Sequence, residues 1–235
     1  MSKQRLWTKD FINITTISFF TFLAFYILMT ALPLQLTQEF GGGADQAGLQ
    51  LTLFFAAAIL VRPYAGKLVS RVSQKKMLIY SAVAFFLGTL FYPFVTNIGE
   101  LFILRIFHGI TFGFITAIKG TISIRVIPPA RRGEGLSWFS LAMGLGMVFG
   151  PVIGMNLANN GLYTLAFQIC IAVTALSIFL SITIHIPQVE KQAKPSPEKK
   201  VFSLDDLIDR KGAPFALVLF LLAFAYSGVS SFLAL

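Results

Sequence analysis

The chain has 235 residues, of which 56% are hydrophobic and only 12% are charged, with a formal net charge of +9 and a mean hydropathy of +0.77. A soluble domain of this length could not hide so much apolar surface in one core, so the composition excludes a soluble globular protein and predicts an integral membrane protein. The 25 phenylalanines against 2 tryptophans favour lipid-facing helices over a β-barrel, whose strands would alternate in polarity.

Long apolar runs separated by short polar stretches predict the domain organisation. A helix needs roughly 20 apolar residues to cross a bilayer, and the first run is too long for a cleavable signal peptide. Pro33 is expected to kink or end the first helix. We expect a six-helix bundle over 1–184, a polar central linker over 185–212 and the start of a seventh helix over 213–235. The six expected helices cover about 11–34, 46–66, 76–95, 100–124, 136–158 and 162–184.

The basic residues are distributed unevenly between the loops. Apart from Arg105, every Lys and Arg lies at the N-terminus, near 67–76 or 125–132, in the linker, or at a helix end beside one of these, whereas 35–45, 96–99 and 159–161 contain none. By the positive-inside rule, the N-terminus and the linker are expected to be cytoplasmic, in a cell (inner or plasma) membrane. The placement accounts for the positive charge, so we expect no nucleic-acid partner.

The basic stretch from Gly66 to Leu78 carries the first specific motif. It resembles the loop between helices 2 and 3 of the major facilitator superfamily, Gly-x-Leu-x-Asp-Arg-x-Gly-Arg-Lys/Arg-x-x-Leu. Ser70 replaces the motif's Asp, and Ser73 replaces its second Gly. The residues that match the motif are Gly66, Leu68, Arg71, Lys75 or Lys76, and Leu78. The resemblance implies that these residues and Ser70 form a gating loop.

The resemblance implies a fold and a missing partner. It implies an all-α integral membrane protein of the major facilitator type, whose six-helix half consists of two inverted three-helix repeats, here 11–95 and 100–184, plus a seventh helix cut short. The substrate would lie between this half and a C-terminal half that is missing from the chain. Because Ser70 lacks the charge of Asp, we expect a weaker inner gate, and Ser70→Asp is expected to favour the outward-open state.

The expected helix 100–124 carries an embedded charge, Arg105, on one polar stripe. At about 100° per residue, the stripe members fall within roughly 100° of the helix circumference, and they are Arg105, His108, Gly109, Phe112, Thr116 and Lys119. We expect this face to point into the bundle or the central cavity, and to be exposed in a half that lacks its partner. Arg105-x-x-x-Gly109 resembles the family's helix 4 motif, whose arginine is implicated in proton coupling. His108 stands where that motif often has Gln.

Structural alternatives exist for each polar member of the stripe. Arg105 could tie its helix to the first helix through backbone carbonyls or a Tyr hydroxyl. His108 beside it could be a neutral hydrogen-bonding group. Lys119 is expected to extend towards the cytoplasmic surface, leaving its ammonium in water.

The expected helix 136–158 has small residues every fourth position, at Ala142, Gly146, Gly150, Gly154 and Ala158. Such a ridge lets another helix backbone approach closely, and Pro151 adds a bend. The pattern resembles the antiporter motif Gly-x-x-x-Gly-Pro-x-x-Gly, which marks exporters in the superfamily, and Gly146, Gly150, Pro151 and Gly154 match it. Plain close packing is the alternative. The preceding cytoplasmic loop carries Arg131, Arg132 and Glu134.

No carboxylate lies well inside an expected span, so proton coupling would depend on His108 or on the missing half. The chain has no nucleotide-binding loop, metal-ligand spacing or catalytic triad, and we expect no enzyme activity, cofactor or metal. The leading hypothesis is an exporter that exchanges small amphipathic molecules for protons across the lipid bilayer by alternating access. The alternatives are a sugar or metabolite exporter or uniport facilitator, and a non-transporting seven-helix membrane protein.

Overall fold

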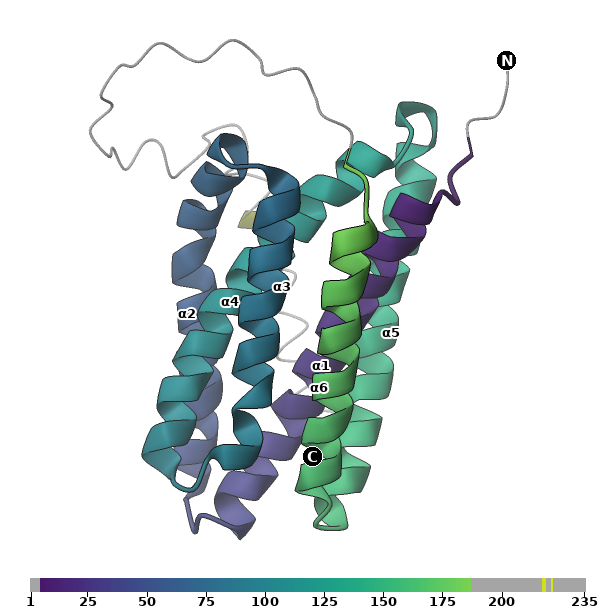
Figure 1. Cartoon of the computed structure of the whole chain (residues 1–235). Coiled ribbons are helices and arrows are strands. Elements are labelled where there is room, and N and C mark those ends of the chain that lie inside the picture. Colours follow the sequence, from purple (N-terminus) through teal and green to yellow (C-terminus); the bar gives the residue numbers. More distant parts are fainter. Residues whose placement is uncertain (1–4, 187–216, 219–220, 222–235) are drawn as a thin grey trace, which may run out of the picture. The chain divides into compact units, whose positions relative to one another are not determined.

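The computed structural model describes residues 5–186, together with Leu217, Val218 and Leu221, which are helical. The chain divides into two units, Met1–Gln188 and Val189–Leu235. Most of the expected linker, 187–212, and most of the expected seventh helix lie outside the described residues. The first unit holds all the elements described below (Figure 1). They are α1 Lys9–Gln38, α2 Ala44–Arg71, α3 Gln74–Leu90, the 3₁₀ turn η1 Tyr92–Phe94, α4 Ile98–Val126, the 3₁₀ turn η2 Pro129–Arg131, α5 Arg132–Asn159 and α6 Tyr163–Thr183.

Among the described residues, six helices are long and apolar enough to cross a membrane, which confirms the expected spans. Pro33 does not end α1, which continues for five residues to Gln38. The hydroxyl of Thr37 donates to the carbonyl oxygens of Pro33 and Leu34. Proline is tolerated inside membrane helices where side chains and neighbours satisfy the backbone groups that it frees, so the expectation of a helix end was wrong.

The basic stretch is more helical than its composition suggested. α2 extends through Gly66 and ends at Arg71, and α3 begins at Gln74. Only Val72 and Ser73 separate the two helices, so most of the expected loop is the last turn and a half of α2. Basic side chains are favourable there because the C-terminal end of a helix carries a partial negative charge.

The end of the third span also differs from the expected one. α3 ends at Leu90 rather than near Val95, and the chain turns through η1, where Pro93 breaks the regular helix. This turn carries Tyr92 into the bundle interior, where the residue is 1% exposed.

The six helices form two groups that exchange their first members. α1 packs mainly against α5 and α6, whereas α4 packs mainly against α2 and α3, and α3 also contacts α6 (Figure 1). Each expected repeat therefore contributes its first helix to the second and third helices of the other repeat. Since α1 and α4 begin at opposite ends of the bundle, the two groups are inverted with respect to each other, as the resemblance implied.

Hydrogen bonds join α1 to α6 and to the residues that follow α6. Asn13 donates to the hydroxyl of Thr183 at 3.0 Å near one end, and the hydroxyl of Tyr163 donates to Gln38 at 2.6 Å near the other. The backbone N–H of His185 donates to Asp10 at 2.7 Å, which fixes the exit of α6 beside the start of α1.

The small-residue ridge of α5 faces α1. A Cβ added at Gly146 would lie 2.9 Å from the backbone nitrogen of Leu23, and one at Gly150 would meet Tyr26. All five ridge members are buried, namely Ala142, Gly146, Gly150, Gly154 and Ala158. The close approach predicted from the sequence is therefore made to a helix of the same half.

Candidate transport site on helix α4

The polar stripe of α4 faces the interior of the six-helix bundle. Arg105 and His108 are fully buried, and Lys119 is 1% exposed. The expectation that a single half would expose this stripe was wrong, because α1, α2 and α3 already surround it. Within the described residues, the stripe is therefore a core feature of this half rather than its open face.

Arg105 lies on α4 two turns after the helix begins at Ile98, and its guanidinium is supported mainly by aromatic groups. Its Cζ lies 4.5 Å from the centroid of the Phe54 ring on α2, a cation–π arrangement. Its Nη1 donates to the hydroxyl of Tyr92 at 3.5 Å, the upper limit for such a bond. Its Nε and Nη2 have no partner among the described residues. The expected tie through a Tyr hydroxyl is present, but it leads to η1 rather than to α1.

His108 joins the same network from the next turn of α4. Its Nδ1 lies 3.0 Å from the hydroxyl of Tyr92, and its Nε2 lies 3.4 Å from the hydroxyl of Thr89 on α3. Its ring stacks on Phe85 with the centroids 4.3 Å apart. Both ring nitrogens therefore face a hydroxyl group, which can donate or accept a hydrogen bond.

Gly109 allows α2 to approach the site. A Cβ at this position would collide with the carbonyl oxygen of Phe54, so only glycine fits. This approach places Phe54 against Arg105, and it packs Phe54 with Phe25 and Phe112, whose ring centroids lie 5.2 and 5.3 Å away. The glycine of the motif thus acts by positioning the aromatic platform under the arginine.

Gln50 adds an unexpected polar group on α2, one turn before Phe54. It is fully buried, and neither its amide nitrogen nor its amide oxygen has a partner among the described residues. Buried amides are normally hydrogen-bonded, and two of the guanidinium nitrogens of Arg105 are also without partners.

Lys119 does not extend to the surface as expected. Its Nζ lies 5.2 Å from the centroid of the Phe22 ring on α1 and has no hydrogen-bond partner among the described residues. A buried charge without a counter-charge or a hydrogen bond is costly.

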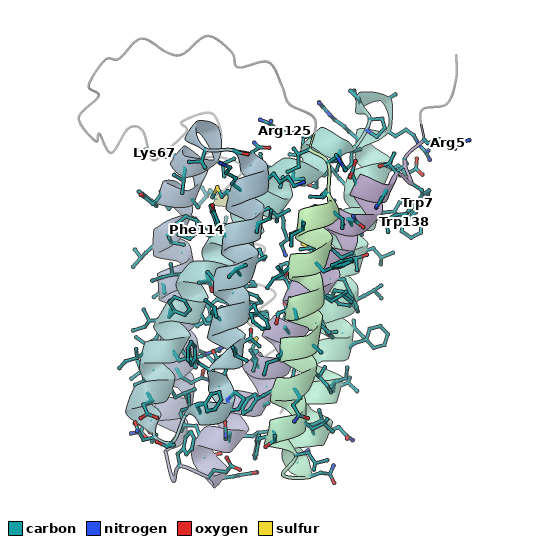
Figure 2. The ribbon with its side chains drawn as sticks, viewed as in Figure 1. Arg5, Trp7, Lys67, Phe114, Arg125 and Trp138 are labelled. Carbon is teal, nitrogen blue, oxygen red and sulfur yellow. The ribbon has the colours of Figure 1, made fainter. Side chains whose placement is uncertain are left out.

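The expected gating residues lie at one end of the bundle, which we call the basic end. Arg5, Lys67 and Arg125 mark this end in Figure 2. Lys76 is exposed and Lys75 half-buried, and both belong to the first turn of α3. The side chains of Ser70 and Arg71 lie outside the described ones, so their role stays a prediction. The site residues predicted at this end are Gly66, Leu68, Ser70, Arg71, Lys75 and Lys76.

The loop before α5 is held at the same end by an ion pair. The guanidinium of Arg131 contacts the carboxylate of Glu134 at 2.6 Å, and Arg132 begins α5. Trp7 and Trp138 meet beside it with ring centroids 5.1 Å apart (Figure 2). These basic-end residues are therefore separate in the fold from the Arg105 network, which lies towards the other end of α4.

Sequence reasoning missed Tyr92, Phe54 and Gln50. Tyr92 belongs to a Tyr-Pro pair at the end of an apolar run. Nothing in the neighbouring sequence predicts that its hydroxyl lies in the interior of the bundle. Phe54 looks like any lipid-facing phenylalanine until Gly109 is placed against it. Gln50 was detectable as a polar residue within an otherwise apolar run of α2. The described residues hold no group of three His, Cys, Asp or Glu side chains that could bind a metal.

A six-helix bundle of two inverted, exchanged repeats with an embedded arginine on its fourth helix defines one half of a multi-pass membrane transporter of the facilitator type. Comparison with known families agrees, since the model of the Major Facilitator Superfamily matches residues 14–235. The chain belongs to this superfamily, whose members are transporters and not enzymes.

Several curated proteins are similar to the chain. It is 29% identical over 190 residues to "Uncharacterized MFS-type transporter YuxJ" of Bacillus subtilis, covering 80% of this chain and 45% of the relative. It is 26% identical over 149 residues to "Multidrug resistance protein 3" of the same species, covering 63% and 29%. It is 28% identical over 190 residues to "Multidrug resistance protein MdtG" of Dickeya zeae, covering 79% and 45%. The chain thus spans less than half the length of each of these three relatives.

Proposed function

We propose that the protein containing this chain is a secondary active transporter that exports small amphipathic molecules in exchange for protons. The observation that carries the proposal is the embedded arginine of this superfamily member: Arg105 is buried in the same network as His108, and two of its guanidinium nitrogens have no partner among the described residues. Relatives named as multidrug resistance proteins support export of such molecules. The glycine ridge of α5, which matches the exporter motif, supports the same direction.

Alternating access between the two halves is the proposed mechanism. Arg105 would hold a fixed positive charge throughout the cycle, because an arginine keeps its own proton at any working pH. A carboxylate that has released the coupled proton, or an acidic group of the substrate, would balance that charge. His108 lies one turn further along α4, and the hydroxyl of Tyr92 contacts both side chains. A carboxylate in the second half is the other candidate for the coupled proton.

Substrate-dependent proton flux tests this proposal. The full-length protein is reconstituted into vesicles that contain a pH-sensitive dye, and cationic drugs and sugars are added in turn. The proposal expects proton movement with amphipathic drugs and none with sugars. Proton-free movement of a sugar or metabolite would instead support the second candidate, a metabolite exporter or uniport facilitator.

We also propose that the basic end faces the cytoplasm, because the positive-inside rule favours that side for Lys and Arg. A membrane-impermeant maleimide tests the orientation in intact cells, in a background whose native cysteines, including Cys170, are replaced. Asn160→Cys lies at the opposite end and is exposed, whereas Lys76→Cys is exposed at the basic end. Labelling of Asn160→Cys alone supports the proposal, and labelling of Lys76→Cys alone contradicts it.

A further inference from the structure

His108 lies in a closely fitted slot that α3 and η1 form in the interior of the bundle. Its ring stacks on Phe85 with the centroids 4.3 Å apart, and a Cβ added at Gly88 would lie 2.8 Å from its Cδ2. Its Nδ1 faces the hydroxyl of Tyr92, and its Nε2 faces the hydroxyl of Thr89. A ring turned by half a revolution would present carbon atoms to both hydroxyls, so these contacts fix the orientation of the ring.

The hydroxyl of Thr89 determines which ring nitrogen carries the proton. A hydroxyl has one proton to donate, and Thr89 donates it to the carbonyl oxygen of Phe85 at 3.0 Å. Towards His108 this hydroxyl can therefore only accept a hydrogen bond. The ring nitrogen that faces it is Nε2, at 3.4 Å. The tautomer follows from the hydrogen-bond network: the proton lies on Nε2.

The hydroxyl of Tyr92 accounts for the other ring nitrogen. Its oxygen accepts a hydrogen bond from Nη1 of Arg105, which leaves its own proton free for Nδ1 of His108 at 3.0 Å. A neutral imidazole with its proton on Nε2 has an acceptor at Nδ1. A charged imidazolium would have a second N–H there, and the proton of Tyr92 would lose this acceptor. The contacts are therefore all satisfied when the ring is neutral.

These contacts form one chain of hydrogen bonds in which every donor points the same way. The chain begins at Nη1 of Arg105, passes through the hydroxyl of Tyr92 and the ring of His108, and reaches the hydroxyl of Thr89. It ends on the carbonyl oxygen of Phe85. A buried polar network whose members are all satisfied specifies one arrangement, so the ring of His108 holds Tyr92 where it contacts Arg105.

The groups that surround the slot supply no counter-charge for an imidazolium. Arg105 is itself a cation, so a protonated His108 would have a like charge one turn away. From α2 the slot receives the ring of Phe54, with its centroid 5.8 Å from that of His108. From α6 the thiol of Cys170 approaches, and it contacts a backbone carbonyl oxygen of α1. Glu100, the described carboxylate of α4, is exposed near the start of the helix.

We propose that His108 is a neutral positioning residue for Arg105, with its proton on Nε2, and that another group carries the proton exchanged for substrate. The inference rests on the proposed export function, which it deepens by removing His108 from the candidates for the coupled proton. The ring acts through Tyr92, which it holds against one guanidinium nitrogen of Arg105. The carboxylate in the second half is then the candidate that stays.

NMR locates the ring proton directly in the parent protein. The full-length protein is prepared with isotope-labelled histidine, reconstituted into lipid vesicles and studied by solid-state nitrogen NMR between about pH 5 and 8, the range in which an ordinary histidine changes its charge. His108→Gln identifies the signals of His108 by their loss. We expect a protonated Nε2 and an unprotonated Nδ1 throughout. Protonation of both nitrogens within this range, or a proton on Nδ1 alone, would overturn the proposal.

Two substitutions at His108 separate positioning from proton transfer. Glutamine can accept from Tyr92 and donate to Thr89 but takes up no proton at a working pH, whereas leucine forms neither hydrogen bond. We expect His108→Leu to lower proton-linked efflux by the full-length protein about tenfold, the effect of losing one buried hydrogen bond. His108→Gln is expected to restore most of that efflux, with the pH profile of the parent.

Membrane abundance, measured by immunoblot, serves as the control for both variants. The proposal is wrong if the two variants are as abundant as the parent and both lose proton coupling. It is also wrong if His108→Leu is as active as the parent, because the ring would then position nothing. The NMR measurement decides the tautomer even if a variant fails to insert.

A matched pair of threonine variants tests the assignment of Nε2. Thr89 and Thr174 are both buried, and each donates to the carbonyl oxygen four residues earlier, at 3.0 and 2.7 Å. Of the two, Thr89 is the one that faces His108. We expect Thr89→Val to shift the NMR signals of His108 and Thr174→Val to leave them in place. The same His108 spectrum in both variants would contradict the assignment.

The positioning role and the proposed function can fail separately. If His108 keeps its proton on Nε2 but vesicles show no substrate-dependent proton flux, the proposed function fails while the tautomer stands. If the parent shows that flux and His108→Gln, at normal abundance, abolishes it, the proposed function stands while the positioning role fails.

Discussion

Arg105 illustrates why the residue type matters as much as its charge. Its planar guanidinium lies over Phe54 and contacts Tyr92 with one nitrogen, while Nε and Nη2 have no partner in the part of the chain that the structure describes. A guanidinium carries five N–H donors in a fixed fork, so it can keep this support and still bind a further group. A lysine ammonium at the same position is more compact and could not contact all of these partners at once.

We therefore expect Arg105→Lys to keep membrane abundance and to lose most proton-linked efflux by the full-length protein. Arg105→Ala removes the cost of an embedded charge, about 2.5–3.5 kcal/mol on insertion scales, and is expected to be at least as abundant and still inactive. Immunoblots of membranes and efflux assays measure the two properties. Full activity in Arg105→Ala would contradict a functional role, and a collapse of its abundance would make Arg105 a structural tie.

Tyr92→Phe tests the shared hydroxyl that links Arg105 to His108. The change keeps the ring, which stacks on Phe167 with centroids 5.9 Å apart, and removes the hydroxyl that contacts both side chains. We expect a loss of about 1–3 kcal/mol in stability, because two buried groups lose a partner. Tyr80→Phe is the matched control, since Tyr80 is 67% exposed. Equal denaturation midpoints for the two variants would show that the hydroxyl stabilises nothing.

At the scale of the helices, glycine sets two close contacts that correspond under the internal repeat. α5 uses Gly146, Gly150 and Gly154 against α1, whereas α4 uses Gly109 and Gly113 against α2. In both pairs the absent side chain lets backbone meet backbone. In a bilayer such packing supplies the association energy that the hydrophobic effect supplies in water.

Gly150→Ala and Gly144→Ala separate packing from helix propensity on one helix. A Cβ at Gly150 would collide with Tyr26, whereas one at Gly144 meets nothing within 4 Å. We expect Gly150→Ala to lower stability by about 1–3 kcal/mol through overpacking, and Gly144→Ala to leave it unchanged or slightly raised. Thermal unfolding of the solubilised full-length protein measures both variants. If both variants changed the stability by the same amount, the ridge would not act by packing against α1.

At the scale of the whole molecule, the half has a core of its own. Its buried polar stripe, which contains Arg105, His108 and Lys119, is covered by helices of the same unit, although α2 and α5 leave large apolar faces outside. Leu60 on α2 is 78% exposed and Val152 on α5 is 65% exposed. Lipid or the second half is expected to cover these faces.

We expect the chain of residues 1–235 to insert and fold but not to transport. Its buried polar stripe needs no cover from a second half, whereas alternating access needs two halves that move against each other. Purified 1–235 in vesicles is compared with the full-length protein by resistance to proteolysis and by efflux. Efflux by 1–235 in the absence of any partner chain would contradict the prediction.

The sequence by itself determined the number of described spans, the end of the bundle at which Lys and Arg gather, and the positions of the motifs. Apolar runs of about 20 residues, loops with and without Lys or Arg, and fixed spacings such as Arg105 to Gly109 are local properties. The exchange of helices, the burial of the α4 stripe and the roles of Tyr92 and Phe54 were decided only by the tertiary structure. Each of these depends on which helix packs against which. The periodicity of a sequence predicts that a helix has a polar face, but it does not predict which neighbouring helix covers that face.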